Sequence, residues 1–210
     1  SGAGPEAWLA GGLKAPTKAH KAWQVLVQQV IMGKLAMPTN LAEGMAADSA
    51  DWLKKRIAVG MTASKNGLPM NMDAWDGYPA ARERLQQASL NAGANLLVLT
   101  GDSHNAWAFD LEHKGSRVGV EMAGHSVTSP GAEGSVRWRK PDALAAEIVA
   151  RNSQLKWCDT SQRGYMVVEL TPKSATSEWR FLTTVRQRGT ALAGTKRMTV
   201  LAGQRRFTAS

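Results

Sequence analysis

An aspartate and a histidine stand two residues apart directly after an apolar run. The run is NLLVLT, residues 95–100, and Gly101-Asp102-Ser103-His104 follows it. A short continuous apolar run of this kind is typical of a strand buried on both faces. In open α/β sheets, ligands bind just beyond the carboxyl ends of such strands. If the chain stays extended here, the side chains of Asp102 and His104 point the same way.

A carboxylate and an imidazole in one small volume suit a metal centre. The carboxylate brings charge and a hard oxygen, and the imidazole brings a borderline nitrogen. Asn105 comes next. It is predicted to orient a phosphate oxygen, or to form a hydrogen bond to a metal ligand and so hold that ligand in place. Spacing alone leaves a plainer alternative open, in which Asp102 caps a turn and His104 lies on the surface. Two ligands also cannot close a metal site, which needs at least about three protein groups.

Other polar residues carry plainer expectations. Glu121 lies inside the apolar stretch VGVEMAG, so a buried Glu121 would need a partner, such as an arginine or a group behind the ligands. His113 is predicted to lie in a solvated turn, and His20 on the surface. His125 follows a predicted strand, where a core or surface position is expected. Cys158 is interpreted as a packing residue.

Composition limits the classes of protein to which this chain can belong. The chain has 210 residues, of which 43% are hydrophobic and 20% charged, as expected of one globular domain. The formal net charge of +9 leaves phosphate esters, nucleic acid and anionic surfaces open as partners. The single cysteine excludes an internal disulfide and a cysteine zinc site. Apolar runs are too short for a membrane span. Ser1 to Pro5 lack an initiator methionine and are expected to be a cut point or tag remnant.

The elements that must position these residues follow from periodicity and from glycine and proline placement. Helices are predicted over residues 5–13, 46–58, 79–90 and 141–151. Strands are predicted over residues 23–31, 95–100, 107–112, 117–122, 165–170 and 178–185. The stretch from 32 to 73 has little regular pattern and is typical of a functional loop or cover. After Arg186 the chain is polar, basic and weakly patterned, which favours a mobile tail. The order predicts a mixed α/β fold.

Further segments flank the Asp102–His104 motif in a fixed order. Upstream are Trp75-Asp76-Gly77-Tyr78-Pro79 and Arg82-Glu83-Arg84-Leu85, and downstream are Val120-Glu121, then Ser126-Val127-Thr128-Ser129-Pro130-Gly131, and finally Arg163-Gly164-Tyr165 and Glu178-Trp179-Arg180-Phe181. Together with residues 98–104, they resemble the PhoD-like alkaline phosphatases of the metallophosphoesterase superfamily. The resemblance covers roughly residues 6–185.

This resemblance implies that residues 1–186 are the C-terminal half of a catalytic domain, which is half of a four-layer α/β/β/α sandwich, followed by a tail at 187–210. It implies that Asp102 and His104 are catalytic metal ligands and that calcium and iron, or similar ions, occupy the centre. Asn105, which could orient a phosphate oxygen, is the predicted substrate contact. Metal-activated hydroxide would then hydrolyse phosphate mono- or diesters. The remaining ligands would come from a missing N-terminal half. The family is typically exported, so a periplasmic or secreted location is expected.

Two alternatives stay open. The chain alone is expected to bind metal weakly and to hydrolyse little, because most ligands would lie elsewhere. One alternative is therefore a truncated, inactive remnant or a binding module with the same fold. The other is a basic nucleic-acid-binding domain, which the net charge suggests and which predicts a steep salt dependence of affinity. On the phosphatase interpretation, nucleic acid enters only as a phosphodiester substrate.

Overall fold

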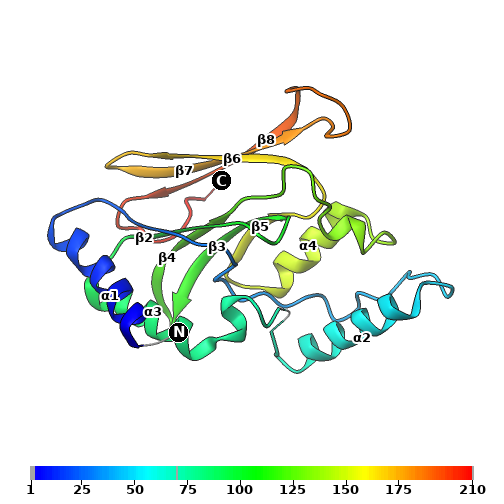
Figure 1. Ribbon diagram of the computed structural model, residues 1–210, viewed down its shortest axis with the longest axis horizontal. Helices are drawn as coiled ribbons and strands as arrows, with labels where there is room; N and C mark the ends of the chain where they lie inside the picture. The colour runs from blue at the N-terminus through cyan, green and yellow to red at the C-terminus, as the bar shows by residue number, and fades with distance from the viewer. Residues whose placement is uncertain (1–2, 70, 210) are drawn as a thin grey trace.

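The structure is a computed structural model that describes residues 3–69 and 71–209, so the expectation about Ser1 and Gly2 lies outside the described residues. Helices, a five-stranded sheet and a three-stranded sheet lie one above the other (Figure 1). The mixed α/β fold predicted from the sequence is confirmed. Helices cover one face of the large sheet and the small sheet covers the other, which gives three layers, in the order α/β/β, of the expected four-layer α/β/β/α sandwich.

The large sheet has the strand order β1-β2-β4-β3-β5. These strands are β1 (Gln24–Val27), β2 (Leu96–Thr100), β4 (Ser116–Ala123), β3 (Ala106–His113) and β5 (Leu155–Asp159). β2 is parallel to β1 and β4, whereas β3 is antiparallel to β4 and β5. The ends of β1, β2, β4 and β5 therefore meet at one edge of the sheet, together with the start of β3. We call this the carboxyl edge.

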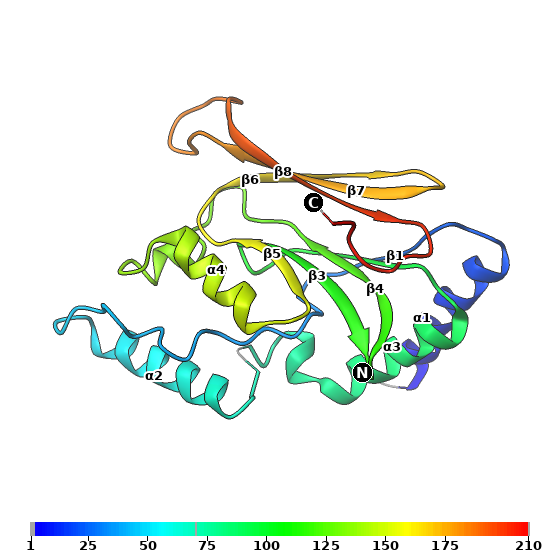
Figure 2. The ribbon, with the colours of Figure 1, turned by 180° about the vertical axis from the view of Figure 1, so that it is seen from behind.

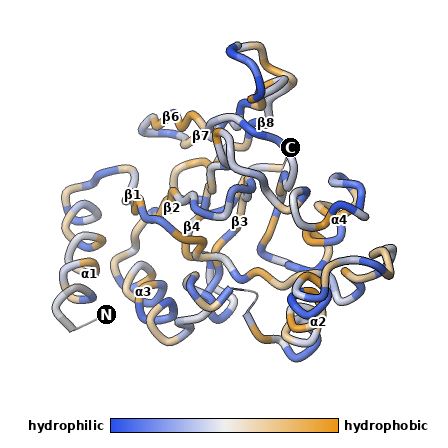
Figure 3. Tube along the Cα trace, turned by 45° about the vertical axis from the view of Figure 1, so that its right-hand side comes forward, coloured by the Kyte–Doolittle hydropathy of each residue, from blue (hydrophilic) through white to orange (hydrophobic). Residues whose placement is uncertain are grey.

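The small sheet is an antiparallel meander. It consists of β6 (Gly164–Leu170), β7 (Ser174–Leu182) and β8 (Leu192–Leu201). The expectation of a mobile tail at 187–210 is wrong for β8, which pairs with β7 from Ser174 to Leu182. The pattern was weak because β8 is an edge strand whose side chains are mostly exposed. Figure 3 shows the connection between β7 and β8 projecting away from the rest of the fold.

Helices line the opposite face of the large sheet (Figure 2). They are α1 (Ala3–Lys18), α2 (Asp51–Lys65), α3 (Pro79–Ala92) and α4 (Pro141–Arg151), with short 3₁₀ turns at Trp75–Gly77 and Ala132–Gly134. α3 and α4 match their predicted spans because a proline occupies the first turn of each. α1 runs five residues past its predicted end, and α2 begins later than predicted, at Asp51. β5 was not predicted.

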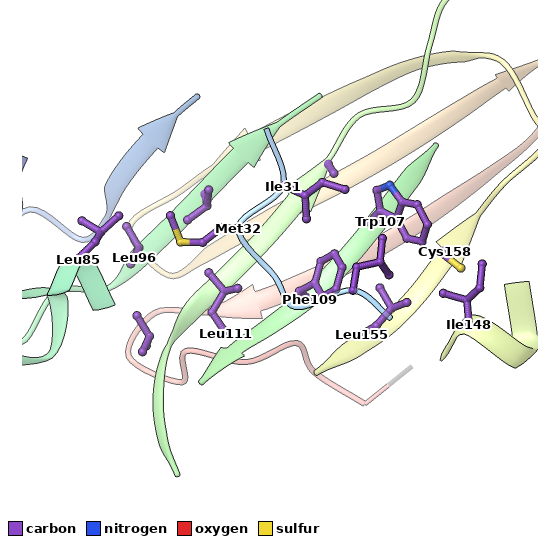
Figure 4. Close-up of a cluster of buried hydrophobic side chains, with 14 of the residues drawn as sticks. Ile31, Met32, Leu85, Leu96, Trp107, Phe109, Leu111, Ile148, Leu155 and Cys158 are labelled. Atoms are coloured by element: carbon purple, nitrogen blue, oxygen red, sulfur yellow. The ribbon is translucent and has the colours of Figure 1, made fainter. Parts of the chain in front are cut away.

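Two apolar cores lie on the two faces of the large sheet. On the helix side, Leu96, Phe109 and Ile148 are fully buried, and Figure 4 shows them with neighbouring side chains. Between the sheets, Trp179 is fully buried and its Nε1 donates to the Ala123 carbonyl oxygen of β4 over 2.8 Å. Its ring lies 4.8 Å from that of Trp157. Large side chains from both sheets therefore meet in this core and fill the space between the two layers.

The first strand departs from its prediction. The run 23–31 was expected to be a buried strand, yet β1 spans only four residues and lies at the edge of the sheet. Val25 and Val27 are 41% and 74% exposed, whereas Leu97, in register with Val25, is fully buried. The small sheet thus covers β2 but leaves β1 open. An apolar strip remains uncovered along this edge.

Candidate metal centre

The turn after β2 carries the predicted ligands at the carboxyl edge of the sheet. Asp102 and His104 have φ values of 59° and 63°, so both lie in the left-handed region. The chain is therefore not extended here, and the expectation that strand alternation aligns these two side chains is wrong. Non-glycine residues in this region cost about 1 kcal/mol each and persist only where neighbours hold them. Both side chains are exposed.

Hydrogen bonds hold this turn in place. Trp107 Nε1 donates to Ser103 Oγ over 2.7 Å, and Ser103 Oγ donates to the Asn105 carbonyl oxygen over 3.2 Å. The Gly101 amide donates to the Gln29 carbonyl oxygen over 3.1 Å, which ties the turn to the segment after β1. The strained residues are therefore supported from β3 and from the segment that follows β1.

His104 has a defined orientation. Its Nδ1 lies 3.0 Å from the carbonyl oxygen of Pro130. A carbonyl oxygen only accepts, so in the neutral ring Nδ1 carries the proton and Nε2 keeps its lone pair. Metal-binding histidines are usually held this way, with the other ring nitrogen donating to a carbonyl or carboxylate. The geometry therefore fits His104 as a ligand through Nε2.

Asp102 is less constrained. Gln29 Nε2 makes a long 3.4 Å contact with Asp102 Oδ1. Asp102 also borders a small cavity of about 40 Å³ together with Asn71 and Asp76. Asp76 forms an ion pair with Arg82, whose Nη1 lies 2.7 Å from Asp76 Oδ1. Sequence reasoning quoted Asp76 only as part of a motif and missed Asn71, which no pattern marks.

Asn105 already has protein partners at both ends of its amide. Its Nδ2 donates to the Ser103 carbonyl oxygen over 2.9 Å, and its Oδ1 accepts from the Ala132 amide over 3.0 Å. These contacts do not test the prediction that Asn105 binds substrate. They do give it a bridging position between the turn after β2 and the segment around Pro130.

Glu121 is a fully buried carboxylate behind the carboxyl edge. It accepts hydrogen bonds from the Met32 and Gly33 amides, each at 2.8 Å, and from Thr100 Oγ1 at 3.0 Å. Burial raises the pKa of Glu121 to about 7, opposed by these hydrogen bonds and by Arg82. A buried Glu121 was expected to pair with an arginine or with a group behind the ligands. Its hydrogen-bond partners are instead two backbone amides and the Thr100 hydroxyl.

The other histidines and the cysteine lie apart from the turn. His125 is buried against Phe181, with ring centroids 4.9 Å apart, and neither ring nitrogen has a hydrogen-bond partner. Burial lowers its pKa, partly offset by the Arg180 backbone and Asp159. His113 is buried at the end of β3, so the expectation of a solvated turn is wrong. His20 is exposed, as predicted.

Cys158 is buried in the core on the helix side, which confirms its interpretation as a packing residue. Burial raises the pKa of this thiol to about 12. It is therefore a poor nucleophile in this position.

The donor set at the edge fits part of a metal site. Within residues 3–69 and 71–209, no three histidine, cysteine, aspartate or glutamate side chains come together to hold an ion. The turn itself presents an exposed carboxylate and an imidazole with a free Nε2. None of the described helices has the length and apolar character to cross a membrane.

Comparisons with known proteins point to one family. A family model described as PhoD-like phosphatase matches residues 1–179. Alkaline phosphatase D of Bacillus subtilis (strain 168) is 32% identical over 198 residues, which cover 90% of this chain and 27% of that protein. A solved structure described as "Structure of PhoD" matches with a TM-score of 0.70 at 25% identity. It covers 99% of this chain and 34% of the matched one. The chain thus spans about a third or less of these relatives.

Proposed function

This chain belongs to the PhoD-like phosphatase family, and on that premise we propose that it is the part of a metal-dependent phosphoesterase that carries Asp102 and His104. The substrates would be phosphate mono- or diesters. One observation carries the proposal: the hydrogen bond between His104 Nδ1 and the Pro130 carbonyl oxygen, 3.0 Å long. It leaves Nε2 free on the same exposed turn as the Asp102 carboxylate.

Each residue would have a distinct role. Asp102 would bind a metal ion through a carboxylate oxygen, steadied by Gln29, and His104 would bind through Nε2. We propose calcium and iron as the ions on the family resemblance alone. Such ions, when bound, lower the pKa of water and stabilise charge on phosphoryl oxygens. The residues of this chain would hold and orient that centre, with Pro130 fixing the His104 ring.

The site would be completed by the missing N-terminal half of the catalytic domain. Two ligands are too few for a metal centre, and the chain spans only 27% of its curated relative. The open edge at β1, with Val27 74% exposed, offers that half a place to pack. On this proposal the isolated chain binds metal weakly and hydrolyses little. Export to the periplasm or beyond is proposed from the family alone.

The test compares the chain alone with the chain joined to the preceding half of a full-length relative. Metal content and hydrolysis of p-nitrophenyl phosphate are measured for both. We expect little of either from the chain alone, and both from the joined protein. Stoichiometric tight metal and normal turnover by the chain alone would contradict the proposed missing half.

A pair of matched variants tests the ligand assignment in the joined protein. His104→Ala should lower kcat by orders of magnitude while leaving the fold intact, because the side chain is exposed. His20→Ala, at another exposed histidine, should leave kcat unchanged. Unchanged turnover of His104→Ala would refute the assignment. A joined protein that folds but neither binds metal nor turns over substrate would favour the inactive remnant instead.

A further inference from the structure

Asn105 joins two segments that are far apart in the sequence. Its Nδ2 donates to the Ser103 carbonyl oxygen inside the turn that carries His104, over 2.9 Å. Its Oδ1 accepts from the Ala132 amide, two residues after Pro130, over 3.0 Å. The side-chain amide of Asn105 therefore joins the turn after β2 to the segment around Pro130. The hydrogen bond between His104 and Pro130 joins the same two segments.

The segment around Pro130 is seated closely on Asn105. A Cβ at Gly131 would lie 2.3 Å from Asn105 Oδ1 and 2.9 Å from the Thr160 carbonyl oxygen, so only glycine allows this approach. The next turn is held by an ion pair between Glu133 and Arg163. Asn105 thus provides one of the contacts between this segment and the turn after β2, together with the 3.2 Å hydrogen bond from the Ser126 amide to the His104 carbonyl oxygen.

The tautomer of His104 depends on where that carbonyl lies. Neutral imidazole carries its proton on either ring nitrogen, and the hydrogen bond made by one nitrogen selects which. A protonated Nε2 has no lone pair for a cation. The carbonyl of Pro130 accepts from Nδ1, so it favours the form with Nε2 free. Any movement of the segment away from His104 would release that selection.

We propose that Asn105 is a positioning residue that keeps the Pro130 carbonyl against His104 Nδ1 and so holds His104 in the tautomer with Nε2 free. This inference rests on the proposed function, because the tautomer matters for the reaction only if His104 binds a metal ion. It differs from the prediction that Asn105 contacts substrate. A substrate contact would change KM and leave the tautomer of the metal-free chain untouched.

The first test needs no activity. The metal-free chain is labelled with ¹⁵N at histidine, and two-bond ¹H–¹⁵N correlations report which nitrogen of each neutral ring is protonated. The chain has four histidines, so His104→Ala assigns the signal. We expect His104 to be protonated at Nδ1 in the wild type. In Asn105→Ala we expect a mixture of the two tautomers, with the other histidines unchanged.

Two further variants control for the possibility that Asn105→Ala simply loses its folded structure. Asn105→Asp keeps an acceptor for the Ala132 amide and places a carboxylate oxygen against the Ser103 carbonyl oxygen, so it should retain the wild-type tautomer because the contact with Ala132 is the one that positions Pro130. Asn91→Ala, at an exposed asparagine of α3, should change nothing at His104. If Asn105→Ala does not fold, a wild-type tautomer in Asn105→Asp still supports the inference, and a mixture in that variant overturns it.

The second test is Zn²⁺ titration of the same variants in the joined protein, where the proposed site is complete, followed at the His104 ring signals. Loss of a group that orients a ligand typically weakens metal binding by about 10–100-fold, and we expect that for Asn105→Ala. A wild-type tautomer in folded Asn105→Ala overturns the inference. A shifted tautomer without Zn²⁺ binding in any joined protein keeps the positioning role and removes the proposed metal function, so the two failures are distinguishable.

Discussion

Thr100 Oγ1 donates a 3.0 Å hydrogen bond to the buried carboxylate of Glu121 at the point where β2 ends. The same carboxylate accepts from the Met32 and Gly33 amides, each at 2.8 Å. Glu121 therefore joins the segment after β1, the end of β2 and the middle of β4. The turn bearing Asp102 starts one residue after Thr100, so its support reaches into the interior of the fold.

Glu121 should make stability fall as pH rises. Its pKa is raised from 4.5 to about 7 by burial, so between these values the folded chain binds more protons than the unfolded chain. The free energy of unfolding contributed by Glu121 is therefore highest below pH 4.5 and is lost as pH rises through about 7. A pKa difference of this size corresponds to about 3 kcal/mol.

Urea unfolding of wild type and Glu121→Gln at pH 5 and pH 8 checks this. Asp110 and His125 also have shifted pKa values, so the difference between the two proteins, not either alone, isolates Glu121. We expect Glu121→Gln to be less stable overall, because an amide nitrogen cannot accept from a backbone amide. Its deficit should shrink from pH 5 to pH 8. An equal deficit at both values would contradict the assignment.

Gly33→Ala should be strongly destabilising. A Cβ at this position would lie 2.5 Å from Cδ1 of Phe109, a fully buried ring in the core on the helix side. Overpacking of this kind costs about 1–3 kcal/mol, and displacement of Gly33 would also weaken its hydrogen bond to Glu121. Thermal or urea unfolding measures the loss.

Gly60→Ala is the matched control for that substitution. Gly60 lies inside α2, and a Cβ there would meet nothing within 4 Å. Alanine in a helix interior is favoured over glycine by about 0.5–1 kcal/mol, so this variant should be more stable than wild type. Equal effects of the two substitutions would show that the contact with Phe109 is not what excludes a side chain at Gly33.

His125 should destabilise the fold at acid pH. Burial holds its pKa below 6.5, so in the window below that value the folded chain binds fewer protons than the unfolded chain. Stability from this group is present above pH 6.5 and is lost as pH falls through the folded pKa. His125→Leu removes the effect, and its urea midpoint relative to wild type should be higher at pH 5.5 than at pH 8. The reverse order would contradict the buried neutral state.

Val27→Lys tests whether the β1 edge packs against the N-terminal half that we propose completes the site. Val27 is 74% exposed, so the substitution should change the stability of the isolated chain by less than about 0.5 kcal/mol. Association with a separately produced N-terminal half should weaken at least tenfold, since a charge would be buried. Val59→Lys is the control, because Val59 is 68% exposed on α2. Equal affinity of both variants would argue against this edge.

Local pattern predicted the elements that have apolar runs and clear ends. β2, α3 and α4 were placed nearly residue for residue, because each combines a marked composition with a proline or glycine at its boundary. β8 was missed because an exposed edge strand needs no apolar alternation. β5 was missed because only Leu155 and Cys158 of its five residues are buried.

The candidate site was predicted in its residues and not in its geometry. Asp102 and His104 were selected from their place after a strand, but their left-handed backbone follows from contacts with Trp107 and Gln29. The partner of His104 is Pro130, 26 residues away, and no spacing rule pairs them. Long-range contacts of this kind arise from tertiary packing, which periodicity does not report.

The end of the described chain has a consequence for synthesis. The Phe207 amide donates to Asp110 Oδ1 over 2.9 Å, and the Phe207 ring is buried in the core between the sheets. That core is therefore incomplete until residue 207 has left the ribosome. Until then the nascent chain would expose part of its inter-sheet apolar face, a surface of the kind that chaperones bind.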